Sequence, residues 1–354
     1  MKFLIRNKEI GQGHPAYIIA EMAWSHDGSL EKAKTIVNAA ARAKADAMCI
    51  HLTSMPDYMV EDYKRVKGGA SRVAEKSSIY NFLSDKNLSK KDWAGLIDLA
   101  HALELSVCAM CNDGPSVDFA AEKGVDAFVL SPASMVEKPL VFRMAKHRKS
   151  VLVRIGGATL GEIEQVIDNL KAGGTDQISL IHGFQSFPTD VEEMNLNRIG
   201  QLEKTFSLPI GFADHVDGSS ELAIIVPIVA IAKGANLIEK HLTHDRSLKG
   251  VDYESALNPD EFAKMVKNIR EVEKAFGKSF WGPLSKKEIE YRYATRKRAI
   301  ALRNIAKGEK LSFNNVALKR ANVGLFPDEF GYLIGKKSKR DLQKNQPITW
   351  DCVG

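Results

Sequence analysis

Short apolar runs alternate with longer amphipathic stretches over the first three quarters of this 354-residue sequence. This alternation is typical of βα units arranged around a parallel sheet. It predicts eight strands, at 16–21, 47–53, 106–111, 127–131, 151–155, 177–182, 209–214 and 236–241. Eight such units close into a barrel more readily than they form an open sheet, so the sequence predicts an α/β fold of the (β/α)8, or TIM barrel, class.

The segments between the strands support this interpretation. Apolar residues recur at three- and four-residue steps in helical stretches at 30–43, 90–102, 160–170, 192–204, 219–233 and 259–276. Three short connections, Lys44–Asp46, Gly124–Asp126 and Gly234–Asn236, are typical of helix C-caps that lead directly into a strand. The glycine-rich turn of a doubly wound sheet does not follow the first strand, where the chain runs Met22–His26.

A change of composition predicts where the barrel ends. We expect a barrel catalytic domain over 1–277, a polar and basic linker over 278–295, and a small β-rich domain over 296–354. Short strands are predicted in that domain at 298–303, 316–320 and 347–350. About 60 residues is close to the lower limit for independent folding, so we expect this domain to lean on the barrel or on a partner.

Charge and cysteine content limit the class of protein. The formal charge of +6 comes from 50 Lys and Arg against 44 Asp and Glu, and its basic clusters lack the interleaved aromatic residues of a nucleic-acid surface. We therefore expect a small-molecule substrate and no nucleic acid. Four cysteines are too few for a disulfide framework, and no window has the ~20 apolar residues of a membrane span. We expect a cytoplasmic protein with no membrane association.

Polar residues at the strand ends are the candidates for chemistry, because catalytic groups of such barrels lie at the C-terminal ends of the strands. His215 follows the seventh strand and His241 ends the eighth. Two imidazoles on neighbouring strands can share one divalent cation and leave positions open for water and substrate oxygens, where the cation would polarise a carbonyl. Glu21, Asp214 and Asp252 are the candidate catalytic carboxylates. A single histidine at a strand end is more often structural, which is the interpretation that we favour for His51.

At these positions the sequence resembles the N-acetylneuraminate (sialic acid) synthase family, which includes pseudaminate and legionaminate synthases and the spore-coat polysaccharide protein E group. The resemblance covers nearly the whole chain. It rests on residues 18–22, 25–28, 158–163, 180–188, 211–215, 238–246, 318–320 and 334–336.

The resemblance implies a (β/α)8 barrel joined to an antifreeze-like (SAF) domain. It implies a condensation of phosphoenolpyruvate with the open-chain aldehyde of an acylated amino sugar, giving a 2-keto acid for surface polysaccharide and releasing phosphate. It also implies Mn²⁺ or Mg²⁺ bound by His215 and His241. Glu21, Gln185, Phe187 and Asp252 fall where the family contacts the sugar.

Arg320 matches the SAF-domain arginine that reaches the partner's active site, which implies a domain-swapped homodimer. A guanidinium is planar and holds its N–H donors in fixed directions, so it suits an acyl carbonyl or a carboxylate in a closed pocket.

The sequence departs from the family in the half of the site that would bind phosphoenolpyruvate. Cys49 stands where the family has a lysine, and Val129–Ser134 replaces a stretch that carries a lysine and a glutamate in the family. Arg154 replaces a serine and becomes the candidate phosphate ligand, because arginine can pair with phosphate in a bidentate way.

These departures leave two alternatives open. One is a metal-dependent aldolase, epimerase or isomerase that acts on a phosphate-free sugar or keto acid. The other is a non-catalytic sugar-binding homologue that kept the scaffold.

Overall fold

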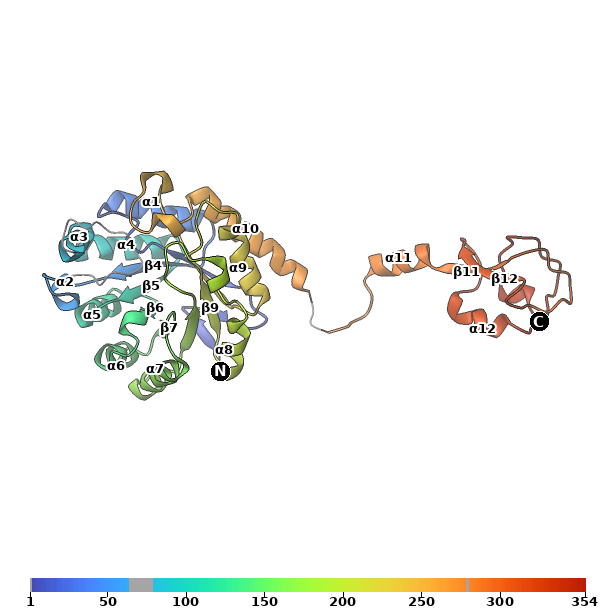
Figure 1. Ribbon diagram of the computed structural model, residues 1–354, viewed down its shortest axis with the longest axis horizontal. Coiled ribbons are helices and arrows are strands. Elements are labelled where there is room, and N and C mark those ends of the chain that lie inside the picture. Colours follow the sequence, from blue (N-terminus) through green and yellow to red (C-terminus); the bar gives the residue numbers. More distant parts are fainter. Residues whose placement is uncertain (1, 64–78, 278–279) are drawn as a thin grey trace. The chain divides into compact units, whose positions relative to one another are not determined.

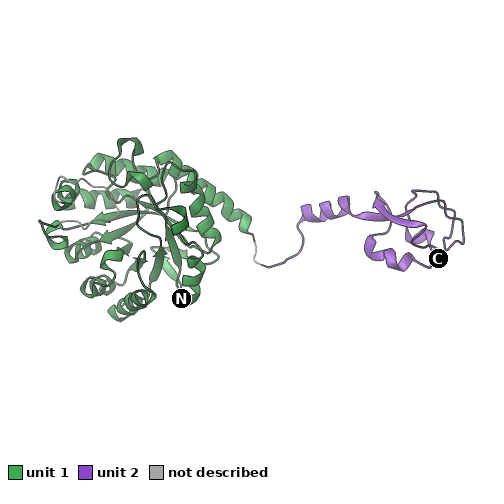
Figure 2. Ribbon diagram, in the orientation of Figure 1, with its two compact units in different colours: residues 1–277 green, residues 278–354 purple. Residues whose placement is uncertain are grey.

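The computed structural model describes residues 2–63, 79–277 and 280–354. These residues form two compact units, 1–277 and 278–354 (Figure 2). Eight parallel strands of the first unit close into a barrel, which confirms the predicted fold class. They are β3 (Tyr17–Glu21), β4 (Ala47–Leu52), β5 (Ser106–Cys111), β6 (Ala127–Leu130), β7 (Ser150–Arg154), β8 (Ile178–His182), β9 (Ile210–Ala213) and β10 (Leu237–His241). A hairpin of β1 (Phe3–Ile5) and β2 (Lys8–Ile10) precedes them.

Helices surround the barrel strands (Figure 1). They are α1 (Leu30–Arg42), α2 (Met55–Tyr58), α3 (Ile79–Lys86), α4 (Lys90–Ala102), α5 (Gly114–Glu122), α6 (Lys138–Lys146), α7 (Leu160–Gly173), α8 (Arg198–Phe206), α9 (Leu222–Ala232) and α10 (Pro259–Phe276). The prediction that a helix begins at 192 is wrong, because a 3-10 turn at Val191–Glu193 and the left-handed Asn195 (φ 47°) delay α8 to Arg198. Within the described ranges no helix is both long and apolar enough to cross a membrane.

Successive residues of each strand face opposite sides of the barrel wall, as strand geometry requires. In β10, Leu237 belongs to a buried cluster inside the barrel, whereas Ile238 packs in the layer between strands and helices. By the same alternation Glu239 and His241 face the interior, and Lys240 faces the helix layer. The apolar part of the interior consists of Tyr17, Ile19, Ala47, Cys49, Cys108, Met110, Ala127, Val129, Leu152, Ile181, Ala213 and Leu237, with Phe3, Ile5 and Ile10 of the hairpin.

The connections that the sequence marked as helix C-caps also fix neighbouring strands to one another. The Asp46 carboxylate, just before β4, accepts a hydrogen bond from the Ile18 amide of β3 at 2.8 Å. In the same way Asp126 accepts from Val107 at 2.8 Å, and Asn236 accepts from Ile210 at 3.2 Å. Each oxygen therefore satisfies a backbone amide near the start of the preceding strand, which holds that end of the barrel closed.

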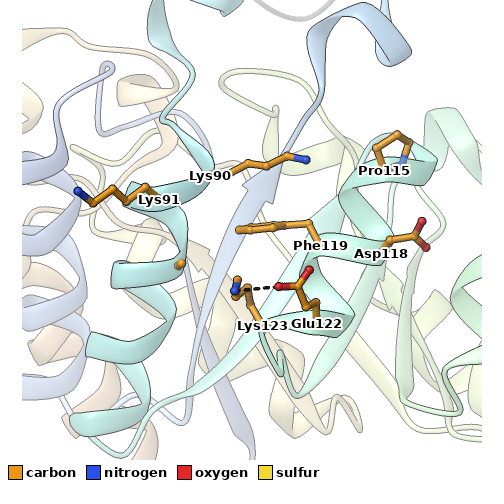
Figure 3. Close-up of a pocket in the computed structure, with 8 residues that line it drawn as sticks. Lys90, Lys91, Pro115, Asp118, Phe119, Glu122 and Lys123 are labelled. Carbon is orange, nitrogen blue, oxygen red and sulfur yellow. Dashed lines mark ion pairs between the residues drawn. The ribbon is translucent and has the colours of Figure 1, made fainter.

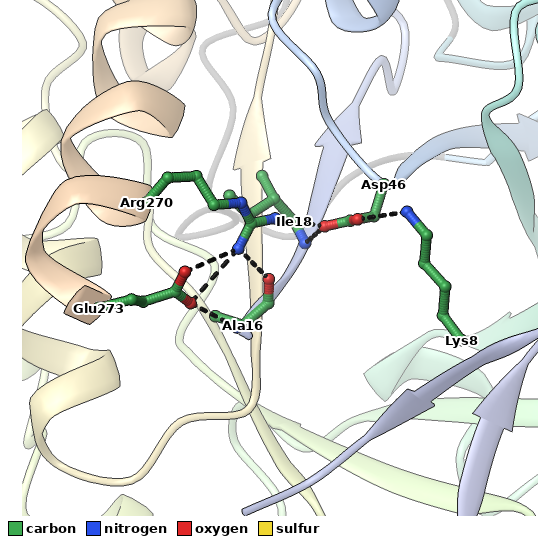
Figure 4. A network of polar contacts seen from close by, with 6 residues as sticks. All are labelled: Lys8, Ala16, Ile18, Asp46, Arg270 and Glu273. Carbon is green, nitrogen blue, oxygen red and sulfur yellow. Dashed lines mark hydrogen bonds and ion pairs between the residues drawn. The ribbon is translucent and has the colours of Figure 1, made fainter. Parts of the chain in front are cut away.

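Asp46 also joins the barrel wall to α10 (Figure 4). Its carboxylate contacts the Arg270 guanidinium at 2.8 Å and the Lys8 ammonium at 2.7 Å. Arg270 in turn donates to the Ala16 carbonyl and pairs with Glu273. This network lies where the strands begin, which is the end of the barrel opposite to the C-terminal ends of the strands.

The second unit contains α11 (Lys286–Thr295) and the antiparallel strands β11 (Lys297–Ala301) and β12 (Val316–Arg320). The helix lies inside the segment predicted as a linker, of which residues 278 and 279 lie outside the described residues. The predicted third strand is wrong: the chain runs along β11 with one isolated bridge, between Ile300 and Pro347, and turns into a 3-10 helix at Trp350. Proline has no amide to extend such a ladder. Apolar residues such as Leu311, Leu325 and Ile348 form this unit's own core.

Candidate active site

His215 and His241 lie side by side where β9 and β10 end. Their ring centroids are 5.2 Å apart, and the residues are 2% and 4% exposed. Both nitrogens of His215 and Nδ1 of His241 are buried without a hydrogen-bond partner among the described residues. Buried polar atoms are seldom left unpaired in folded proteins, so these nitrogens call for a ligand. Their spacing allows two imidazoles to bind one cation at about 2.0–2.2 Å each.

The surroundings keep both imidazoles neutral, which is the form that binds a metal. Burial lowers the pKa of His241 to about 3; the Glu21 carboxylate opposes this shift and the Arg154 guanidinium adds to it. Burial also holds the pKa of His215 well below its usual value, and His241 adds to the effect. The backbone of His215 is fixed from two loops, because its carbonyl accepts hydrogen bonds from Thr189 at 2.8 Å and Ser255 at 2.7 Å.

Arg154 crosses the barrel interior from β7 and pairs with two glutamates on the far wall. Its Nη2 contacts Glu21 of β3, and it also lies 2.8 Å from Oε1 of Glu239 in β10. Its Nε donates to Oε2 of Glu239 at 3.2 Å. All three side chains are at least 95% buried. The two carboxylates raise the pKa of Arg154, so the guanidinium stays charged despite burial.

A second group of potential metal ligands lies in the same place. Glu21, Cys49 and Glu239 bring one ligand atom each to within 4.8 Å of one another. The Arg154 guanidinium already pairs with both carboxylates, and burial raises the pKa of the Cys49 thiol well above its usual value. A cation here would have to displace the guanidinium and deprotonate the thiol. The two histidines are therefore the better candidate metal centre.

Asp214, predicted to be catalytic, lies on the other side of the barrel wall. Its Oδ1 is 2.6 Å from the Lys240 ammonium, and neither side chain has any exposed surface. Asp214 Oδ1 also accepts a hydrogen bond from the Val216 amide at 3.2 Å. These contacts favour a role in holding the backbone that carries His215 over a role in the reaction itself.

His51 is a residue of the mouth whose role the sequence did not reveal. Its Nε2 lies 3.4 Å from Glu21 Oε1, and 13% of its side chain is exposed. Glu21 Oε1 also accepts from the Ala23 amide at 2.7 Å. Burial alone would raise the pKa of Glu21, but His51 and Arg154 hold it well below its ordinary value. The lowered pKa favours the ionised form of the Glu21 carboxylate beside His51.

Asp252, another predicted catalytic residue, belongs to the same neighbourhood. It adopts a left-handed conformation, with φ 61°, at the start of a short 3-10 helix after β10. Burial raises the pKa of Asp252 to about 6, against an opposing effect of His51. A hydrogen bond with the backbone of Trp24 places Asp252 next to the loop that follows β3.

The predicted substrate-binding residues fall in three different environments. The Phe187 ring packs edge-on against both histidines, at centroid distances of 4.8 Å from His215 and 5.8 Å from His241. Gln185 is exposed in the same loop after β8. Arg320 is exposed at the end of β12, in the other unit, and its contribution to the barrel site stays a prediction.

The described residues also form cavities outside the mouth. One of about 580 Å³ lies beside the ends of β7 and β8 and is lined by Gly156, His182 and Arg198 among others. Another of about 680 Å³ lies between α4 and α5, where Figure 3 shows Phe119 below Lys90 and an ion pair of Lys123 with Glu122. None of the predicted site residues lines either cavity.

Comparison with known proteins gives a consistent result for both units. The sequence pattern of the NeuB family matches residues 36–280, and that of the SAF domain matches residues 297–354. The chain is 28% identical to N,N'-diacetyllegionaminic acid synthase of Legionella pneumophila over 98% of this chain and 97% of that protein. It is 32% identical to an uncharacterized protein of Methanocaldococcus jannaschii, over 99% and 98%.

A solved structure agrees with these relatives. The N-acetylneuraminic acid synthetase of Leptospira borgpetersenii, in complex with citrate, superposes with a TM-score of 0.71 at 28% identity. The match covers 83% of this chain and 97% of that one. The second unit therefore contains a SAF domain at 297–354, as the sequence predicted.

Proposed function

We propose that this chain, which belongs to the NeuB family, uses a divalent cation at His215 and His241 to join a three-carbon 2-oxo acid unit to the open-chain aldehyde of an acylamino sugar. As a member of this family the chain is a synthase-type enzyme that forms a carbon–carbon bond with a sugar. The observation that carries the proposal is the pair of buried rings, 5.2 Å apart, whose nitrogens include three with no hydrogen-bond partner in the described part of the chain.

The residues present fit a bound Mn²⁺ or Mg²⁺, which when bound would polarise the sugar carbonyl as a Lewis acid. The neutral rings of His215 and His241 would hold it. Phe187 packs against both rings and excludes water from that side of the pair. Glu21, held in place by Arg154, offers a fixed acceptor for sugar hydroxyls, and the exposed Gln185 would contact the sugar from the loop after β8.

Phosphoenolpyruvate is the donor that the family resemblance implies. The purified protein with manganese and phosphoenolpyruvate would be incubated with a panel of open-chain-forming acylamino sugars, with both phosphate release and product mass recorded. A nonulosonic-type 2-keto acid, of the class used for surface polysaccharide, that forms with the unmodified protein and is lost in His241→Ala would support this donor. If every sugar fails with phosphoenolpyruvate, this donor is excluded.

A second candidate keeps the sugar aldehyde and replaces the donor by one without phosphate. It is favoured by the pairing of Arg154, whose guanidinium is shared between Glu21 and Glu239 instead of being free for a phosphate. Because the guanidinium already pairs with two glutamates, little of its positive charge is left to attract an incoming phosphate dianion. Strict dependence of product formation on phosphoenolpyruvate would exclude this candidate.

Arg320 is proposed to complete the barrel site of a second copy in a domain-swapped homodimer. Its exposure at the end of β12 leaves the guanidinium available for such a contact. Mixing the inactive variants His215→Ala and Arg320→Met tests this, because exchange of subunits would then create one intact composite site in each mixed dimer. Recovery of activity on mixing supports the swap, whereas no recovery in a demonstrably mixed dimer contradicts it.

A cytoplasmic location is part of the same proposal. It is supported by the four cysteines, Cys49, Cys108, Cys111 and Cys352, all of which are free thiols. Fractionation of the native cells would test it.

A further inference from the structure

His51 and Glu21 form a histidine–carboxylate pair inside the barrel mouth. The two residues face the interior from the neighbouring strands β4 and β3, and His51 Nε2 lies 3.4 Å from Glu21 Oε1. A carboxylate beside one ring nitrogen favours the tautomer that carries its proton there. In the tautomer that carries its proton on Nε2, the lone pair of the imidazole is on Nδ1. The pair therefore has the arrangement of a base oriented by an anion.

The surroundings keep this arrangement fixed and reachable. Glu21 is fully buried and is held by the Arg154 guanidinium and the Ala23 amide, so it cannot swing away from His51. The His51 side chain keeps 13% of its surface exposed, so a ligand in the mouth can touch it. Electrostatic interactions join His51 to His241 and Asp252 as well, which places the imidazole among the residues of the candidate active site.

We propose that His51 is a general base that removes a C–H proton next to the carbonyl of the donor, and that the donor is an unphosphorylated 2-oxo acid of the pyruvate class. Glu21 then acts through His51 as a positioning residue, and Arg154 keeps Glu21 in place. This inference rests on the proposed function for its acceptor, the sugar aldehyde. A phosphorylated enol donor is already in the enol form and gives a base of this kind no proton to remove.

The step balances without a further reagent. The C–H bond of the donor's methyl group breaks, its proton passes to His51 Nδ1, and the electron pair forms the enolate. The enolate carbon then forms a bond with the aldehyde carbon, and the carbonyl electron pair moves to the aldehyde oxygen. That oxygen takes the proton back from the His51 imidazolium. The product is a 4-hydroxy-2-oxo acid, and no group leaves.

Proton exchange of the donor alone tests this half-reaction without any sugar. Pyruvate would be incubated in D₂O with the full-length protein and magnesium, and the loss of its methyl proton signal followed by NMR. General base catalysis typically raises the rate of a reaction by about 10²–10⁴-fold. We therefore expect exchange with the unmodified protein and a loss of at least about 100-fold in His51→Gln. Pyruvate binding, measured by saturation-transfer NMR, should persist in that variant, which a collapse of the site would abolish.

The chain offers a matched control in His101, whose Nε2 lies 2.9 Å from Asp126 on the outside of the barrel. His101→Gln breaks a similar histidine–carboxylate pair and should leave the exchange rate unchanged. No exchange with the unmodified protein, or exchange in His51→Gln within about 3-fold of it, would overturn the inference. Condensation with phosphoenolpyruvate but not with pyruvate would also overturn it and leave the proposed sugar condensation intact. Exchange without condensation on any sugar would instead support His51 and reject the proposed acceptor.

Discussion

Replacing Arg154 by methionine should destabilise the barrel strongly, because it removes the cation between two buried carboxylates. Glu21 and Glu239 have at most 1% of their side chains exposed, and Arg154 has 5%. Removal of one partner from a buried ion pair typically costs about 3–5 kcal/mol, since the remaining charge is left without compensation. We expect a loss in this range for Arg154→Met, measured by urea unfolding of the barrel at pH 7.

The loss of stability in Arg154→Met should become smaller as the pH falls. Glu21 has a lowered pKa in the folded protein, so the stability that it contributes is present above the unfolded pKa and is lost on acidification. In Arg154→Met both glutamates are buried without a cation, so the folded form would prefer them protonated and would gain relative stability at low pH. For the same reason Arg154→Met with Glu239→Gln should recover part of the loss at pH 7.

Arg246 provides a matched control for this measurement. Its guanidinium also pairs with a carboxylate, that of Glu261, but the two side chains are 18% and 34% exposed. Ion pairs that are partly exposed in this way contribute about 1 kcal/mol or less to the free energy of unfolding. A loss of unfolding free energy in Arg154→Met below about 1 kcal/mol, or a loss that grows on acidification, would refute the conclusion that Arg154 compensates the charge of the buried glutamates.

Three further changes test other parts of the structure. Lys240→Met should lower the free energy of unfolding in urea by about 3–5 kcal/mol, because it leaves Asp214 buried and unpaired. Adding Asp214→Leu should restore much of this stability. Equal losses for the single and the double variant would contradict this explanation. Because burial raises the pKa of Asp252 to about 6, activity that needs its carboxylate should rise with pH through this value, and Asp252→Asn should remove that limb from the rate profile. Asp46→Ala should destabilise the barrel by about 1–3 kcal/mol by leaving the buried Ile18 amide without its acceptor, and an unchanged unfolding midpoint would contradict this.

The barrel could be predicted from the sequence because each of its units is local. Apolar runs such as 106–111 are long enough for a strand buried on both faces, and connections such as Lys44–Asp46 show where a helix stops and the next strand begins. In the folded chain the Asp46 side chain accepts a hydrogen bond from the Ile18 amide of the neighbouring strand, so the same residue that marks the connection also holds two strands together. The start of α8 could not be predicted, since the conformation of Asn195 decides it and the apolar periodicity continues through it.

The pairing of side chains across the barrel could not be predicted from spacing alone. Arg154 and Glu21 are 133 positions apart, and they meet because closure of the barrel brings β7 and β3 to face each other. His51 has a signal that sequence analysis could have used, since a histidine two residues after Cys49 on one strand must face the same side as that interior residue. Its partner Glu21 becomes visible only when the neighbouring strands are in register.

The most direct measurement of the central claim is a titration of the metal-free protein with manganese, followed by the electron paramagnetic resonance signal of the free ion. We expect one ion bound per chain, and a loss of affinity of at least about 10-fold in both His215→Ala and His241→Ala while His101→Gln binds as the unmodified protein does. Binding of manganese that is unchanged in both histidine variants, or no binding by the folded unmodified protein, would contradict the claim that these two rings hold the cation.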